Sequence, residues 1–78
     1  AHHAVTGVVI KNTDKEIEIA VSKYKDYFVI DSNTKITGKI QNGATVVVGW
    51  KGAYASAKTV ATTIEVKKSP QKASPTTP

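Results

Sequence analysis

The stretch that most constrains the fold is an Asn-Gly pair followed by the most apolar run of the chain. Asn42 and Gly43 lead into Thr45–Lys51, which contains the only Trp, Trp50. Asn-Gly pairs favour a turn with positive φ, and Val46, Val48 and Trp50 then share one face at the two-residue period of a strand. We therefore expect residues 45–51 to form the central strand of a small β-sheet protein.

The apolar composition supports an all-β fold. The core must be built from Val, Ile, Ala and a few aromatic residues, because the chain has no Leu, Met or Cys. Val, Ile and Thr are stiff at χ1 and suit pleated strands better than helices. A core in a chain of 78 residues is small, so closing the sheet or pairing with a second chain would stabilise it.

Alternation and turn residues place the remaining strands. Residues 16–21 alternate most clearly, with Ile17, Ile19 and Val21 inward and the intervening residues outward. Residues 34–38 are expected to form either a short helical turn or an irregular crossing, with Ile36 and Ile40 as core anchors. The other expected strands are 5–10, 27–30 and 57–67.

These elements predict a small five-stranded, OB-like Greek-key barrel over residues 5–68. Residues 1–4 precede any strand pattern and are predicted to be a flexible arm. Residues 69–78 contain three Pro and no large apolar side chain, so we predict a disordered tail or linker.

Several short segments of the chain resemble a bacterial β-barrel family, the domain of unknown function 5666. They are Val5-Thr6-Gly7-Val8-Val9, Thr34-Lys35-Ile36, Gly38-Lys39-Ile40 with Gly43, Val46 and Val48, and Ala61 with Ile64-Glu65-Val66. The resemblance implies an OB-like barrel exported to the periplasm or cell surface, with no established chemistry. This chain has Ala53-Tyr54-Ala55-Ser56 where that family often has an Asp-Gly turn.

The residues needed for catalysis do not form a recognisable set. Both His residues lie in the N-terminal arm, and no Cys is present as a nucleophile. Glu16 and Glu18 could form a carboxylate pair, but with Lys11 and Lys15 nearby a solvated outer face is the simpler interpretation. We therefore predict a non-enzymatic, exported binding or structural module. A protein partner or self-association through edge strands or terminal arms is its expected mode of assembly.

A second hypothesis is binding of single-stranded nucleic acid or an anionic polysaccharide. The formal charge is +5, and most of the excess Lys lies in the second half of the chain. Loop aromatic residues can stack on bases while Lys contacts phosphate. The absence of Arg argues against nucleic acid, because Lys lacks the planar fork that pairs with phosphate. The candidate contacts are Tyr24, Tyr27, Tyr54, Lys23, Lys25 and Lys51.

The first three residues form a candidate metal site. If the amine of Ala1 is free, it can bind Cu(II) or Ni(II) together with two deprotonated amides and the His3 imidazole. These ions prefer such a square plane. His2 would be an axial or competing ligand. We expect no other cofactor, and incidental binding by a mobile arm is the simpler interpretation.

Overall fold

The sheet holds nearly all of the regular structure in this computed structural model, which describes residues 2–70. Its strands are β1 (His2–Asn12), β2 (Glu16–Val21), β3 (Tyr24–Val29), β4 (Lys35–Thr37), β5 (Thr45–Lys51) and β6 (Thr63–Lys68). One 3-10 turn, η1 (Ser56–Lys58), precedes β6. The predicted all-β class is confirmed. Within residues 2–70, no helix has the length and apolar character needed to cross a membrane.

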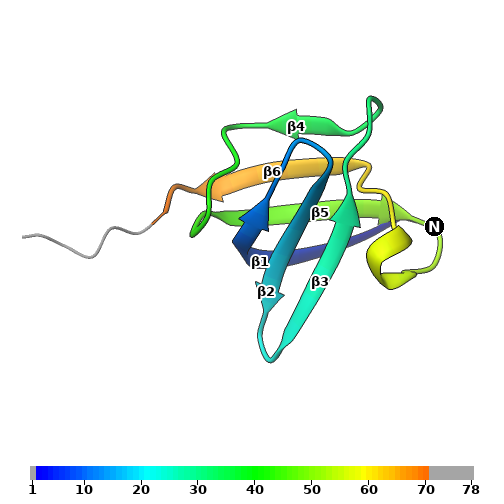
Figure 1. The fold of residues 1–78 in the computed structure, drawn as a ribbon, viewed down its shortest axis with the longest axis horizontal. Coiled ribbons are helices and arrows are strands. Elements are labelled where there is room, and N and C mark those ends of the chain that lie inside the picture. Colours follow the sequence, from blue (N-terminus) through cyan, green and yellow to red (C-terminus); the bar gives the residue numbers. More distant parts are fainter. Residues whose placement is uncertain (1, 71–78) are drawn as a thin grey trace, which may run out of the picture.

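The long strand β1 organises the sheet, whose strand order is β3-β2-β1-β5-β6-β4. It pairs antiparallel with β2 along its second half and with β5 along its first half. A register shift between Val9 and Lys11 marks a bulge in β1. Figure 1 shows the result: the β2–β3 hairpin crosses in front of β5 and β6, as in a curled barrel.

Closure of the barrel is partial. The end of β3 lies beside the segment before β6, joined by the parallel bridge between Val29 and Val60. The Val29 N–H donates to the Thr59 carbonyl at 2.7 Å, and the Ala61 N–H donates to the Val29 carbonyl at 2.8 Å. The barrel therefore has six strands rather than the predicted five, and a short bridge closes it instead of a full ladder.

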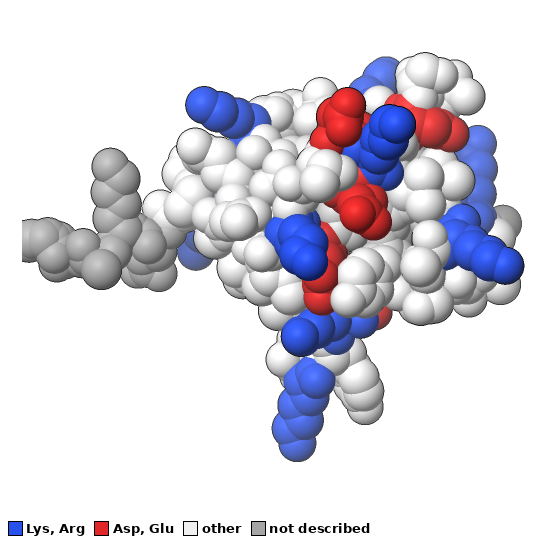
Figure 2. All heavy atoms as spheres, viewed as in Figure 1, with Lys and Arg blue, Asp and Glu red and all other residues white. Residues whose placement is uncertain are grey.

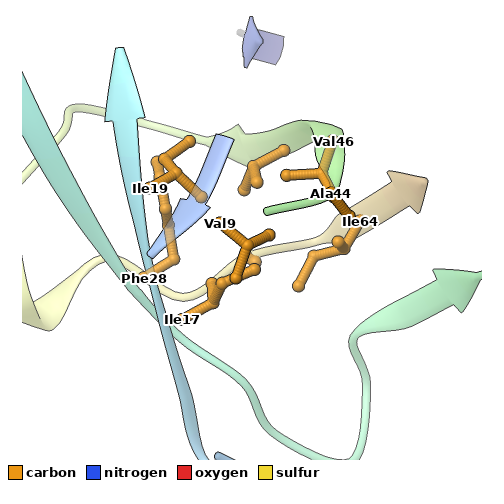
Figure 3. Packing of buried hydrophobic residues seen from close by; sticks show 9 residues of the cluster. Val9, Ile17, Ile19, Phe28, Ala44, Val46 and Ile64 are labelled. Atoms are coloured by element: carbon orange, nitrogen blue, oxygen red, sulfur yellow. The ribbon is translucent and has the colours of Figure 1, made fainter. Parts of the chain in front are cut away.

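The core lies inside this curled sheet and is almost entirely aliphatic. Its fully buried members come from the inward faces of the strands and from two short connections (Figure 3). They are Val9, Ile17, Ile19, Phe28, Ala44, Val46, Val48, Ala61 and Ile64. The alternation predicted for 16–21 and 45–51 is confirmed by these residues, because odd positions of β2 and even positions of β5 face inward.

The N-terminal arm predicted over residues 1–4 is wrong from His2 onward. His2, His3 and Ala4 continue β1 and lie opposite Lys51, Trp50 and Gly49 of β5. The backbone hydrogen bonds of this pairing extend the strand where the sequence has too few apolar residues to predict it. The tail predicted over 69–78 falls, from residue 71, outside the described residues.

Two further predictions are corrected. Residues 34–38 were expected to turn or cross irregularly, but Lys35–Thr37 forms β4, which pairs parallel with β6. Ile36 is 44% exposed and is not a core anchor, whereas Ile40 packs against the core. The strand predicted over 57–67 is interrupted, because Ser56–Lys58 turns as η1 and β6 begins only at Thr63.

Candidate functional site

Four rings from separate parts of the chain meet at one end of the barrel. His3 of β1 stacks on Trp50 of β5, with ring centroids 5.4 Å apart and an interplanar angle of 28°. Phe28 of β3 tilts against Trp50 at 5.2 Å. Tyr54, from the β5–β6 connection, meets Phe28 and Trp50 edge-on at 5.6 and 5.9 Å. We call His3, Phe28, Trp50 and Tyr54 the aromatic end.

Strand register brings these rings together. His3 lies directly opposite Trp50 in the β1–β5 pair, so the two side chains share a face. Phe28 lies opposite Ile17 in the β2–β3 pair and therefore faces the interior. The curl of the sheet then closes Phe28 onto Trp50. The sequence placed Trp50 on one face of its strand with Val46 and Val48, and its ring packs against the core.

The indole of Trp50 has an unusual property. Its Nε1 atom is buried and has no hydrogen-bond partner among the described residues. Buried donors are nearly always paired in proteins, and an unpaired one calls for a specific explanation. The aromatic end therefore contains a polar group that no described protein atom satisfies.

One carboxylate lies next to the aromatic end along β3. Asp26 occupies the inward face of the strand, two residues before Phe28 and opposite Ile19, and is half-buried. Among residues 2–70 the only ion pair joins Lys67 and Glu65, so Asp26 forms none there. Sequence reasoning missed Asp26 because it began this strand at Tyr27. The spacing of 24, 26 and 28 would have placed Asp26 on the face of Phe28.

The donor atoms near the aromatic end suit some metal ions better than others. No group of three or more His, Cys, Asp or Glu side chains gathers within the described part of the chain. The chain also has no Met and no Cys, so the thioether and thiolate ligands that soft ions select are absent. The available donors are the His3 imidazole and the Asp26 carboxylate. Imidazole nitrogen with carboxylate oxygen fits Cu(II), and does not fit a soft site for Ag(I).

The predicted N-terminal metal site is described only in part. Ala1 lies outside the described residues, and His2 and His3 belong to β1. His3 is exposed at one side while its ring stacks on Trp50. The structure thus adds an indole neighbour to the His3 imidazole.

The Tyr and Lys residues predicted to bind an anionic polymer do not form one surface. Tyr24 is 73% exposed next to the turn of the β2–β3 hairpin, between Lys23 and Lys25. Tyr54 instead packs in the aromatic end. Lys51, at the end of β5, pairs with His2 and lies on a different part of the sheet from the hairpin turn.

Tyr27 faces the outside of the sheet, opposite Glu18 of β2. Its hydroxyl donates a hydrogen bond to the Glu18 carboxylate, which raises the pKa of Tyr27 above its ordinary value; burial and the charges of Glu18 and Glu16 act in the same direction. Glu18 is only 7% exposed, so the outer face predicted for it holds a covered carboxylate rather than a solvated one. A carboxylate beside Tyr27 disfavours a phosphate at this position.

Figure 2 shows the charge on the face that carries the β2–β3 hairpin. Acidic side chains gather near the middle of this face, with Lys side chains among and around them. No continuous basic patch covers it. This mixed pattern gives an anionic polymer no extended track on this face.

The edges of the sheet offer little backbone for strand pairing. β4 is three residues long, and the exposed edge of β3 is partly covered by contacts from residues 54 and 59. Short and covered edges are the usual protection against edge-to-edge association. They limit the self-association through edge strands that the sequence suggested.

Comparison with known proteins defines the fold. No protein-family model and no curated protein sequence matches the chain. The chain is similar in structure to silver-bound CusF, with a TM-score of 0.72 and 21% identity over 86% of this chain and 99% of that one. It is also similar to a Cu(II)-bound variant of CusF from Escherichia coli in which a Trp is replaced by Ala. That match has a TM-score of 0.70 and 21% identity, and covers 86% of this chain and 92% of the other.

Metal-free CusF from Escherichia coli matches with a TM-score of 0.69 and 21% identity over 87% of this chain and 89% of that chain. These matches establish the OB-like fold predicted from the sequence. The structures they describe are silver-bound CusF, a Cu(II)-bound variant of CusF and metal-free CusF. The resemblance to the domain of unknown function 5666 stays a prediction.

Proposed function

We propose that this domain is a non-enzymatic, exported module that binds Cu(II) at the aromatic end, with His3 as the principal ligand. The observation that carries the proposal is the His3 imidazole held against Trp50 at 5.4 Å. The CusF structures with Cu(II) and Ag(I) support a metal as the ligand of such a fold.

The ligand set favours Cu(II) over Ag(I). Cu(II) accepts imidazole nitrogen, amine or amide nitrogen and carboxylate oxygen, whereas Ag(I) selects sulfur ligands that this chain lacks. His3 supplies the nitrogen, and Asp26 is the nearest inward-facing carboxylate along β3. In a chain whose first residue is Ala1, the terminal amine and two backbone amides form an alternative set around the same imidazole.

Trp50 supports the proposal in two ways. A cation near the face of an indole is attracted by the ring quadrupole, so a metal on the His3 imidazole would be stabilised by the stacked Trp50. The same proximity makes Trp50 a reporter, because paramagnetic Cu(II) quenches indole fluorescence at short range.

The test is a titration of the domain with CuSO4 while Trp50 fluorescence and the visible spectrum are recorded. We expect saturable quenching at one ion per chain and a d–d band. His3→Ala should abolish both signals, whereas His2→Ala removes only an axial or competing ligand and should leave saturable binding in place. Two further changes separate the donor sets. Asp26→Asn should weaken Cu(II) binding only by the set that contains the Asp26 carboxylate. Acetylation of the terminal amine should weaken it only by the set that contains the amine and the two backbone amides. Quenching that persists in His3→Ala would contradict the proposal.

Two further arms test the alternatives. AgNO3 should bind weakly in the same assay, since sulfur ligands are absent. A single-stranded oligonucleotide at low salt should not change the fluorescence, because the Glu18 carboxylate lies beside Tyr27 and disfavours a phosphate there. A salt-sensitive response to the oligonucleotide would favour the nucleic-acid hypothesis instead.

Export is tested by fractionating cells of the source.

A further inference from the structure

The connection between β5 and the Val29–Val60 bridge crosses the aromatic end as a strap. We define the strap as residues 52–58, which include η1. All seven residues are exposed, and η1 buries none of its side chains. A segment with so few buried contacts is held to the barrel by its individual attachments rather than by a core of its own.

Tyr54 attaches the strap to β3, and the Ala55 N–H attaches it to the hydroxyl of the buried Thr59. The Tyr54 hydroxyl accepts a hydrogen bond from the Tyr27 N–H at 3.1 Å, across 27 residues of sequence. The Tyr54 ring lies edge-on to Phe28 and Trp50. The side chain is nevertheless 40% exposed, so it sits on top of the aromatic end rather than inside it.

The Tyr54 hydroxyl takes the place of a backbone carbonyl that a neighbouring strand would offer to β3. At Val29 the edge of β3 donates to the Thr59 carbonyl, as in a parallel ladder. The next outward-pointing N–H along this edge belongs to Tyr27, and a continued ladder would offer it the carbonyl of residue 57. The chain instead turns as η1 at Ser56–Lys58, and the phenolic oxygen of Tyr54 takes that hydrogen bond.

Two residues with positive φ bracket Tyr54. Gly52 has φ of 80° with open space around its α-carbon, and Ser56 has φ of 56°. A left-handed conformation is strained at a residue with a side chain, and it persists only where surrounding contacts impose it. Gly52 can change its backbone angles freely, and Ser56 relaxes if the strap leaves. Both are suited to act as hinges.

We propose that residues 52–58 form a hinged cover that Tyr54 latches onto β3, and that its opening exposes the Trp50 indole and the Tyr27 N–H together. This attachment couples two groups that are otherwise unrelated, because the Tyr54 side chain both covers the Trp50 ring and accepts the hydrogen bond of the Tyr27 N–H. Opening would give a ligand access to the aromatic end. That consequence for metal binding rests on the proposed function, whereas the opening of the strap does not.

The experiment measures amide hydrogen exchange of the metal-free domain by NMR. Tyr54→Phe removes only the hydroxyl and keeps the ring contacts, so the variant should fold. We expect the Tyr27 amide to exchange about fivefold faster, as the loss of one net hydrogen bond predicts, while the Val29 amide keeps its rate. Tyr24→Phe is the matched control, because Tyr24 is the most exposed aromatic residue, and it should change neither rate.

A second variant tests the cover. Tyr54→Ala should speed exchange at Tyr27 further and raise the acrylamide quenching constant of Trp50 about twofold or more. Equal acceleration at Tyr27 and Val29 in Tyr54→Phe, or none at Tyr27, would overturn the proposal; so would unchanged quenching in Tyr54→Ala. Because no metal is present, these results are independent of the Cu(II) titration, and either proposal can fail alone.

Discussion

Two adjoining regions of the barrel interior are built on different principles. One region, around Ile17, Ile19, Val46 and Ile64, is aliphatic, and each of these side chains is fully buried. The aromatic end is made of four large rings, of which Phe28 alone is fully buried and Tyr54 is 40% exposed. The residues named for the aliphatic region come from β2, β5 and β6, whereas the aromatic end also depends on the strap, whose seven residues are all exposed.

This difference separates stability from binding within one small domain. Close-packed aliphatic groups stabilise in proportion to the area they bury and offer no chemistry to a ligand. The aromatic end holds an imidazole, a neighbouring carboxylate and an indole N–H without a hydrogen-bond partner in residues 2–70, and the strap is attached there through Tyr54. We expect substitutions in the first region to change mainly the free energy of unfolding, and those in the second to change mainly access and binding.

The largest effect is expected from truncation of the aliphatic region. Ile19→Ala should lower the free energy of unfolding by about 2–5 kcal/mol, because it removes fully buried methylene groups and leaves a cavity. This is a large share of the stability of so small a domain. Urea unfolding measures the change. Ile36→Ala is the matched control; with 44% of Ile36 exposed, it should cost less than half as much. Equal losses of unfolding free energy in Ile19→Ala and Ile36→Ala would contradict the distinction between the buried aliphatic region and the rest of the molecule.

A smaller effect is expected at the aromatic end. Trp50→Phe should lower the free energy of unfolding by only about 1 kcal/mol, because the Nε1 group it removes makes no hydrogen bond with a described residue. The contact with Phe28 can persist in the smaller ring. Because this variant has lost the indole, its urea unfolding is monitored by circular dichroism rather than by fluorescence. A loss as large as that of Ile19→Ala would show that both regions hold the fold equally.

The smallest effect is expected on the outer face, at alkaline pH. The pKa of Tyr27 is raised in the folded protein by its hydrogen bond to Glu18, so the folded state retains the phenolic proton more tightly than the unfolded state. That contribution is complete below pH about 10 and is lost as the pH rises through the raised pKa. The wild-type urea midpoint should therefore fall more between pH about 8 and about 11 than that of Tyr27→Phe.

Glu18→Gln is the control for that comparison. It removes the carboxylate that raises the pKa of Tyr27, so its alkaline loss should resemble that of Tyr27→Phe. A wild-type loss no larger than that of the two variants would contradict the interaction.

The sequence predicted the strands that carry a clear local pattern. The alternation in Glu16–Val21 and the Asn-Gly turn before Thr45–Lys51 set both strands correctly. The errors fall where a distant partner decides the structure. His2–Ala4 join β1 only because β5 is there to pair with them. Residues 57–62 have strand composition, but Ala57 and Lys58 turn within η1 and Val60 forms only an isolated bridge with Val29.

The candidate site was harder to predict than the fold. His3 and Trp50 were each noted in the sequence, yet nothing local indicates that they stack, because the contact depends on register between residues 47 positions apart. Tyr54 was a candidate contact for an anionic polymer in the second hypothesis, with packing of its loop as the alternative. Its hydrogen bond to the backbone of Tyr27 requires the closed sheet, which no periodicity encodes.

The central position of β1 also has a consequence for how the chain folds. The first strand of the domain pairs along its N-terminal half with β5, which lies far along the sequence. The adjacent hairpin β2–β3 can form early, from residues close in sequence, whereas the β1–β5 ladder must wait until a long loop closes. Topologies dominated by such distant pairs fold slowly, in milliseconds to seconds. The aromatic end, which needs β1, β3 and β5 together, would thus be among the last parts of the molecule to assemble.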